Sequence, residues 1–187
     1  MILRIKNMVC DRCILVVKQH LENLGFHVTN IMLGIADIEP SPDAAQLSSI
    51  SSEFKLLGFE LIDSEKDRLV ERIKNLVIEK VHYSDLADVR FTFSEYLSSS
   101  LHKEYTYLSR MFSESEDATI EKFIIQQKIE KVKELMEYGE LNLNEIAWKM
   151  GYSSSAHLSA QFKNITGLTP SKFKATQKTG RKPIDKI

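Results

Sequence analysis

The chain has 187 residues, 43% of them apolar and 27% charged, which is typical of a folded globular protein rather than a disordered one. No run of about eighteen apolar residues occurs, so the sequence predicts no membrane-spanning helix. Only two cysteines are present, three residues apart, which argues against a disulfide-stapled secreted scaffold. The first residues lack the apolar core of an export signal, and we therefore expect a cytoplasmic location.

Charge is distributed unevenly along the chain, although the formal net charge is only −1. Residues 1–63 contain 5 basic and 8 acidic side chains, whereas residues 118–187 contain 12 and 7. The basic C-terminal part allows a contact with nucleic acid but does not establish one.

The first 63 residues alternate between short strands and helices. The two-residue period of a half-buried strand, and the turns that bound such strands, predict strands at 2–7, 27–33, 35–39 and 59–62. The helix between the first two strands ends at Gly25 and has the apolar face Ile14, Val17, Leu21 and Leu24. The other helix is opened by Ser41-Pro42-Asp43, ends at Gly58 and has the apolar face Leu47, Ile50, Phe54 and Leu57. This βαββαβ order predicts a ferredoxin-like domain at 1–63, with both helices on one face of an antiparallel sheet.

From residue 64 onward the pattern is helical. A connecting helix is expected at about 65–82, within a linker over 64–85, with the buried face Val70, Ile73, Val77 and Val81. Residues 86–175 predict an all-α domain, whose helices are separated by the acidic segment 113–117, Gly139 and Gly167. Residues 176–187 have little to bury and are expected to form a mobile tail. The predicted fold class is therefore α+β, with a ferredoxin-like domain followed by an all-α domain that contains two helix-turn-helix units.

The clearest of these units covers residues 141–173. Asn142 can cap a helix that carries Leu143, Ile146, Ala147 and Met150. Gly151 supplies a turn, and a second helix starting near Ser153 buries Leu158 and Phe162. The outward face of this second helix is polar, as in helices that enter the DNA major groove. An ordinary helical hairpin explains the same pattern equally well.

The segments EIAWKMGY and GLTPSKF resemble the second helix-turn-helix unit of AraC-type transcription regulators. In that family, the tail motif that locks the last helix corresponds here to Gly167, Thr169, Pro170 and Phe173. Residues 119–136 resemble the family's long central helix, with the buried positions Ile125, Ile129, Val132 and Met136. Residues 95–112 resemble its first helix-turn-helix unit, with the core Leu97, Leu101, Leu108 and Phe112. This first unit departs from the family pattern in having Ser98, His102 and Glu104 where a small residue, the turn glycine and a serine are usual.

The resemblance implies which side chains face DNA. In the first unit the base-reading positions are Thr106, Ser109 and Arg110, and in the second they are Ser155, Ala156 and Ala160. The polar residues His157, Gln161 and Lys163 are further candidates on the second helix. Because Arg110 can bond a guanine bidentately, we expect the first recognition helix to dominate base reading. Alternatively, Arg110 forms a solvated pair with Glu114, four residues further on.

Two other features of the helical half are interpreted more simply. We expect Trp148 to pack between helices rather than to stack on bases. We expect Lys128, Lys131 and Lys133 to form the solvated face of the central helix, with electrostatic steering of DNA as the alternative.

The two cysteines, Cys10 and Cys13, lie on the loop between the first strand and the first helix. A helix N-terminus favours thiolates, and two thiolates at this spacing can bind Cu(I) or Zn(II). Residues 1–63 resemble heavy-metal-associated domains, whose loop reads Met-x-Cys-x-x-Cys. This resemblance implies that Met8 supports the loop and that Cys10 and Cys13 are metal ligands, although the family's glycine is Asn7 here. Metal binding, a redox switch and inert structural cysteines remain three alternatives.

No phosphate-cradling glycine loop, nucleophile elbow or His-Glu-x-x-His motif occurs, so the sequence does not predict an enzyme. It predicts a sequence-specific DNA-binding transcription regulator that requires no cofactor, with Cu(I) or Zn(II) as a candidate modulator. The expected partner is double-stranded DNA, with RNA polymerase and a second copy of the chain as further candidates and no membrane. The alternative is a metal carrier or thiol redox module whose helical domain binds protein instead of DNA.

Overall fold

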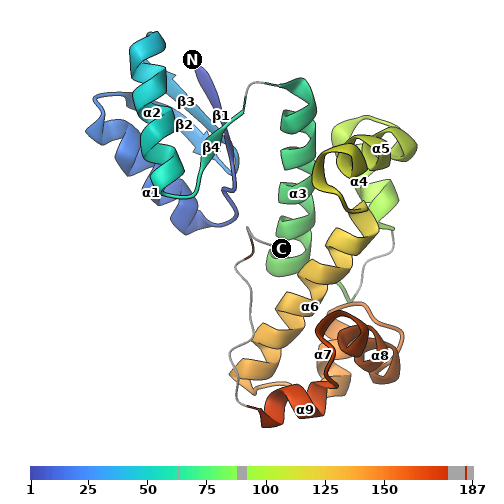
Figure 1. The fold of residues 1–187 in the computed structure, drawn as a ribbon. Helices are drawn as coiled ribbons and strands as arrows, with labels where there is room; N and C mark the ends of the chain where they lie inside the picture. Colours follow the sequence, from blue (N-terminus) through green and yellow to red (C-terminus); the bar gives the residue numbers. More distant parts are fainter. Residues whose placement is uncertain (63, 88–91, 177–183, 185–187) are drawn as a thin grey trace. The chain divides into compact units, whose positions relative to one another are not determined.

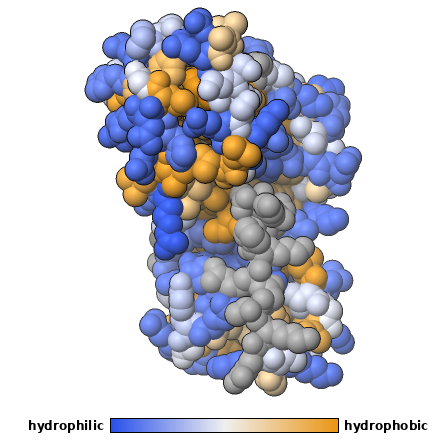
Figure 2. All heavy atoms as spheres, turned by 60° about the vertical axis from the view of Figure 1, so that its left-hand side comes forward, coloured by the Kyte–Doolittle hydropathy of each residue, from blue (hydrophilic) through white to orange (hydrophobic). Residues whose placement is uncertain are grey.

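The computed structural model describes residues 1–62, 64–87, 92–176 and 184. The chain divides into two compact units, residues 1–75 and 76–187, and the division falls within helix α3 (Glu65–Tyr83) (Figure 1). Within the described ranges, no helix combines the length and apolarity needed to cross a bilayer. On the face seen in Figure 2, hydrophilic residues cover much of the surface and hydrophobic residues gather in smaller patches between them.

The first unit contains a small antiparallel sheet. Its elements follow the predicted order, namely β1 (Ile2–Lys6), α1 (Asp11–Asn23), β2 (His27–Met32), β3 (Ile35–Glu39), α2 (Ala44–Leu56) and β4 (Glu60–Leu61). The strands are arranged β2-β3-β1-β4, so the first strand is central, and neighbouring strands are antiparallel. Strand β4 has only two residues, which makes it shorter than the strand predicted at 59–62.

The core of this unit lies between the sheet and its two helices. In β1, Leu3 and Ile5 are buried, as the alternation of the sequence predicts. They belong to the same core cluster as Val17 and Leu21 of α1 and Ile50 and Phe54 of α2. Both helices therefore pack on the same face of the sheet.

The start and the predicted apolar face of α2 each need one correction. Asp43 is the N-cap and forms a capping box with Gln46, so Pro42 precedes the cap instead of occupying the first turn. Leu57 is 37% exposed, because it lies at the C-cap where the helix ends before Gly58 and where its side chain no longer follows the buried stripe.

Helix α3 closely matches the predicted connecting helix. Its expected face is buried throughout, at Val70, Ile73, Val77 and Val81. The first part of the helix belongs to the first unit and the last part to the second.

The second unit is helical. Its helices are α4 (Phe93–Leu101), α5 (Tyr105–Glu116), α6 (Ile120–Tyr138), α7 (Leu143–Lys149), α8 (Ser155–Thr166) and α9 (Pro170–Ala175). Gly139 and Gly167 end α6 and α8 in the left-handed conformation, as predicted. The predicted break at 113–117 is mostly helical instead, and the chain turns only at Asp117, which has a φ of 50°. An aspartate tolerates this conformation, so the serine-rich composition did not mark the turn itself.

Most of the predicted core of the second unit is buried. All four predicted core residues of the first helix pair are inside, namely Leu97, Leu101, Leu108 and Phe112. In α6, Ile129, Val132 and Met136 are buried, whereas Ile125 is only half-buried and its neighbour Ile124 takes the inner position. The helix therefore presents a slightly rotated face at its start.

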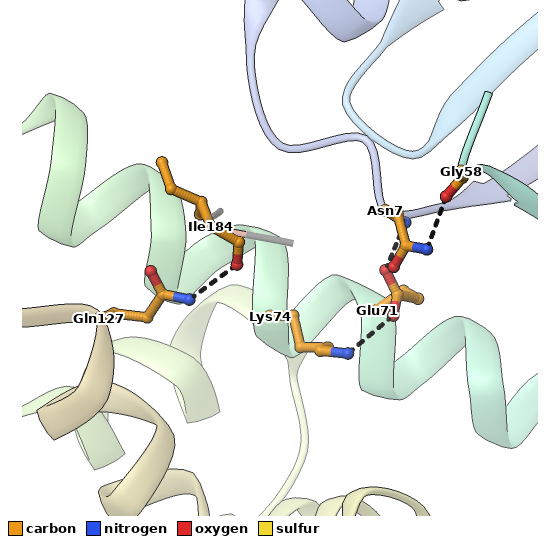
Figure 3. A network of polar contacts seen from close by, with 6 residues as sticks. All are labelled: Asn7, Gly58, Glu71, Lys74, Gln127 and Ile184. Carbon is orange, nitrogen blue, oxygen red and sulfur yellow. Dashed lines mark hydrogen bonds and ion pairs between the residues drawn. The ribbon is translucent and has the colours of Figure 1, made fainter. Parts of the chain in front are cut away.

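The predicted mobile tail is described only at Thr176 and Ile184. The backbone carbonyl of Ile184 accepts a hydrogen bond of 3.3 Å from Nε2 of the buried Gln127 (Figure 3). Oε1 of Gln127 lies 2.8 Å from Nε2 of His82. The rest of the predicted tail lies outside the described residues.

Candidate nucleic-acid interface

The first helix pair, α4 and α5, is fixed by a cap and a turn. Thr92 and Glu95 form a capping box at the start of α4, and the backbone N–H of Thr92 lowers the pKa of Glu95. His102 ends α4 with φ 51° and ψ 44°, the left-handed conformation that the family resemblance placed there. Glu104 is the N-cap of α5, but its side chain makes no capping hydrogen bond.

The outer face of α5 carries the three predicted base-reading residues of this pair. Thr106 and Arg110 are exposed and Ser109 is half-buried. Sequence reasoning missed Tyr107, which is 38% exposed and lies between two cations. The Nζ atom of Lys103 lies 5.3 Å from the Tyr107 ring centroid and the guanidinium carbon of Arg110 lies 5.8 Å from it. The sequence signal that could have identified this cluster is its helical spacing, because Lys103, Tyr107 and Arg110 are four and three residues apart.

The second helix pair, α7 and α8, is also fixed by caps and a turn, which are formed by different residues. Asn142 and Glu145 form a capping box at the start of α7, and Ser154 caps α8. Gly151 makes the turn with a φ of 68°, and a Cβ at this position would lie 3.0 Å from the backbone oxygen of Leu86. Both the conformation and the close approach therefore favour glycine.

Two of the predicted DNA contacts on α8 are already engaged within the domain. The hydroxyl of Tyr152 donates a 2.6 Å hydrogen bond to Oε1 of Gln161. Nδ1 of His157 lies 3.1 Å from the hydroxyl of Ser153, and its ring packs edge-on against Tyr152 with centroids 5.4 Å apart. Burial raises the pKa of Tyr152, so its hydroxyl stays a donor.

The other candidates on α8 differ in exposure. Lys163 is exposed, as are Ala156 and Ala160, and Ser155 is half-buried. The two alanines offer only methyl groups, so α8 presents fewer free polar side chains than α5.

The lysines of α6 do not form the solvated face that the sequence predicted. Lys128 donates a 3.0 Å hydrogen bond to the backbone oxygen of Met150, and burial lowers its pKa. Lys133 is 5% exposed and donates a 2.6 Å hydrogen bond to Glu130, which is equally buried. Lys131 pairs with Glu134 at 3.1 Å. Lys128 therefore ties α6 to the end of α7, whereas Lys131 and Lys133 pair with carboxylates of α6 itself.

Trp148 contradicts its predicted packing role. Its side chain is 62% exposed on α7, beside the buried pair Ile146 and Ala147. The buried face of this short helix is narrow and is occupied by Ile146 and Ala147, so the indole of Trp148 lies on the solvent-exposed face.

The tail motif performs the locking role that the resemblance implies. Thr169 caps α9, Pro170 occupies its first turn, and Phe173 is buried. The Phe173 ring packs edge-on against Phe162 of α8, with centroids 5.4 Å apart. Helix α9 thereby fixes the position of α8.

The cysteine loop belongs to the first unit. Asn7 takes the expected glycine position with a φ of 70°, and its side chain donates a 2.9 Å hydrogen bond to the Gly58 carbonyl. Its backbone N–H donates to Oε2 of Glu71 at 3.3 Å, and Glu71 also pairs with Lys74 at 3.3 Å (Figure 3). Met8 is fully buried, which agrees with its predicted role as a support of the loop.

The two thiols of this loop lie side by side. Cys10 and Cys13 are free and half-buried, and their Sγ atoms are 3.5 Å apart. Burial raises the pKa of the Cys13 thiol, so desolvation outweighs the helix N-terminus that was expected to favour the thiolate. The described residues contain no group of three or more His, Cys, Asp or Glu side chains placed to hold a metal ion. The pair therefore suits a soft ion that accepts two thiolates better than a zinc ion, which takes four ligands.

Comparison with known proteins supports the resemblance in the helical half. Residues 97–176 match the family model described as a helix-turn-helix domain. The chain is 27% identical over 128 residues to the Msm operon regulatory protein of Streptococcus mutans, covering 68% of this chain and 44% of that protein. An uncharacterized HTH-type transcriptional regulator of Pseudoalteromonas carrageenovora is 30% identical over 101 residues, 54% of this chain and 56% of that protein.

A solved structure gives the same result. The C-terminal domain of AraT, a response regulator from Geobacillus stearothermophilus, has a TM-score of 0.51 and 25% identity, covering 64% of this chain and 94% of that one. The matched part of the chain spans less than half the length of the Msm relative. The family model lies wholly within the second unit. Residues 97–176 form a helix-turn-helix domain, in agreement with the AraC-type resemblance of the sequence.

Proposed function

We propose that the protein is a sequence-specific DNA-binding transcription regulator, with α5 and α8 as its recognition helices. The observation that carries this proposal is that both helix pairs of a matched helix-turn-helix domain leave the outer face of their second helix exposed. An exposed helix held by a tight turn is the shape that enters a major groove. The relatives named as regulators support the same class of function.

The two recognition helices would have unequal roles. On α5, Arg110, Thr106 and Ser109 would read base edges, and Lys103 would approach the phosphates. On α8, Lys163 and Ser155 would contact the backbone, and Gln161 and His157 would read bases with only part of their hydrogen-bonding capacity, because Oε1 of Gln161 and Nδ1 of His157 are engaged within the domain. Base reading would therefore rest mainly on α5.

Selection from random DNA followed by gel shifts at several salt concentrations tests the proposal. A regulator would bind the selected sequence far more tightly than a scrambled duplex, and the preference would persist as salt weakens both complexes. Equal affinity for both duplexes would contradict the proposal and favour a helical domain that binds protein. Double-stranded DNA is thus the first partner to test, before RNA polymerase or a second copy of the chain in the cytoplasm.

We infer that the first unit is a ferredoxin-like domain of the heavy-metal-associated kind. The element order, the strand order β2-β3-β1-β4 and the shared core of α1 and α2 support this assignment. The left-handed Asn7, the buried Met8 and the adjacent thiols support a metal-binding loop.

A second candidate function is modulation of DNA binding by a soft metal ion at the two cysteines. When bound, Cu(I) would be held by the thiolates of Cys10 and Cys13. Equilibrium dialysis against Cu(I) should show uptake by the wild type and not by a Cys10→Ser/Cys13→Ser variant. Equal uptake by the two proteins would exclude this site, whatever the result of the DNA experiment. Zn(II), measured in parallel, should bind more weakly because the pair supplies too few ligands.

A further inference from the structure

A cavity of about 320 Å³ lies in the first unit, away from the cysteine loop. It is lined by β1, α2, the end of β4 and the first turn of α3. Strand β4 pairs with β1 only at Ile5 and Lys6, with one further hydrogen bond from the Ile62 N–H to the Arg4 carbonyl. The short strand leaves the first half of β1 without a neighbour on this side, and the cavity occupies that space.

One residue of the cavity wall has an unsatisfied donor. Arg68, in the first turn of α3, lines it, and the Nε atom of Arg68 is buried without a hydrogen-bond partner. Among the residues that the structure describes, this is the one buried side-chain nitrogen or oxygen in that state. A buried guanidinium N–H without an acceptor is costly, so such a group points to an acceptor that binds from outside the chain.

The rest of the lining indicates what that acceptor is. Arg4 adds a second positive charge, Ser48 and Ser51 add hydroxyl groups, and no Asp or Glu is among the described lining residues. The remaining wall is apolar, formed in part by Ile2, Leu47 and Leu61. Arginine bonds carboxylate and phosphate oxygens best, and apolar walls favour a hydrocarbon body. The volume is at the lower end of the range for small-molecule sites.

We propose that this cavity binds a small organic anion, a carboxylate or phosphate carried on a short apolar body, and that Arg68 is its main anchor. The charged end pairs with the Arg68 guanidinium, and the apolar end lies against the leucines of α2 and β4. The site is separate from the proposed DNA and metal sites, so its occupancy can be measured without either ligand.

The test is an NMR titration of the full chain with benzoate, phenyl phosphate and inorganic phosphate, with benzyl alcohol as the uncharged probe. We expect saturable shifts at residues 2–4, 47–51, 61–62 and 68 with benzoate or phenyl phosphate, and weaker ones with inorganic phosphate. Benzyl alcohol should give none. The stronger of the two aromatic anions identifies the preferred headgroup.

Matched variants decide whether Arg68 is the anchor. Arg68→Gln should weaken binding of the preferred anion by about tenfold or more, because it removes a charge-assisted hydrogen bond. Arg72→Gln, one turn further along α3 and exposed, should bind like the wild type. Without ligand, Arg68→Met should unfold at the same temperature as the wild type or a higher one, because methionine removes the buried unpaired donor, whereas the amide of glutamine keeps one at that place. Absence of saturable shifts with every anion, or wild-type affinity in Arg68→Gln, would overturn the proposal.

Discussion

The two helix pairs of the second unit share one architecture and differ in the chemistry of their outer faces. Both have a capping box, a left-handed turn residue and a buried phenylalanine that contacts another phenylalanine outside the pair. On α5 the exposed face carries Arg110 and Tyr107, whereas on α8 Gln161 and His157 are held by neighbours. A repeated scaffold therefore does not imply repeated function, because packing uses the inner positions and recognition uses the outer ones.

The largest expected effect tests whether the two pairs are equivalent in packing. Phe112→Ala and Phe162→Ala should each destabilise the second unit by about 3–5 kcal/mol, because both rings are fully buried. Urea unfolding followed by circular dichroism at the helix band measures the loss. Tyr138→Ala, at a 63% exposed position, is the control and should change stability by less than about 0.5 kcal/mol. A loss below about 1 kcal/mol in either phenylalanine variant would show that its pair is loosely packed.

The next effect tests the inequality of the outer faces. Arg110→Ala should cost roughly 1–3 kcal/mol of binding free energy at a selected DNA site and relax the preference for one base. Gln161→Ala should cost less, because the Gln161 amide already bonds to Tyr152. Gel shifts on the selected site and on single-base variants measure both. If Arg110→Ala weakened all sequences equally, Arg110 would be a phosphate contact, and a larger loss from Gln161→Ala would reverse the assignment of the two helices.

A smaller effect concerns the two turns. Gly151→Ala should destabilise the second unit by about 1–2 kcal/mol, because a side chain at a φ of 68° is strained and the new Cβ would approach Leu86. His102→Gly should stabilise it by up to about 1 kcal/mol, because glycine removes the same strain from the first turn. Thermal unfolding of both variants gives the sign. Destabilisation by His102→Gly would mean that the imidazole makes a contact worth more than the strain.

The smallest effect concerns the cap of the first pair. The folded pKa of Glu95 is lowered by the Thr92 N–H, so its contribution to stability is present above the unfolded pKa and is lost as pH falls through the folded one. Urea unfolding between about pH 5 and pH 3 should therefore show a smaller decline in Glu95→Gln than in the wild type. Identical declines in the two proteins would mean that the ionised carboxylate of Glu95 does not contribute to stability.

Much of the fold could be predicted because the signals are local. The two-residue period of Leu3 and Ile5 and the helical period of Val70, Ile73 and Val77 correctly identified a strand and a helix. The tail motif around Pro170 correctly located α9 and the helix-turn-helix domain. The base-reading roles and the metal site stay predictions, since exposure and proximity are compatible with them without testing them.

The positions that sequence reasoning misjudged depend on partners distant along the chain. From the sequence, Lys133 is expected to be solvated. In the structure its Nζ lies 5.7 Å from the ring centroid of the distant Phe173 and pairs with Glu130 on its own helix. Trp148 has the side chain of a core residue, but the buried face of α7 is occupied by Ile146 and Ala147.

Sequence alone determined most of the helices and strands and the helix-turn-helix character of residues 97–176, because hydrophobic period, capping residues and turn glycines act within a few residues of one another. Only the tertiary structure decided which polar groups are free to bind a partner. Gln161 is engaged because Tyr152 reaches it, and the buried Nε of Arg68 is left without a hydrogen-bond partner. Whether a polar side chain is already hydrogen-bonded depends on the groups that the folded chain places beside it, and the pattern of apolar residues does not encode those groups.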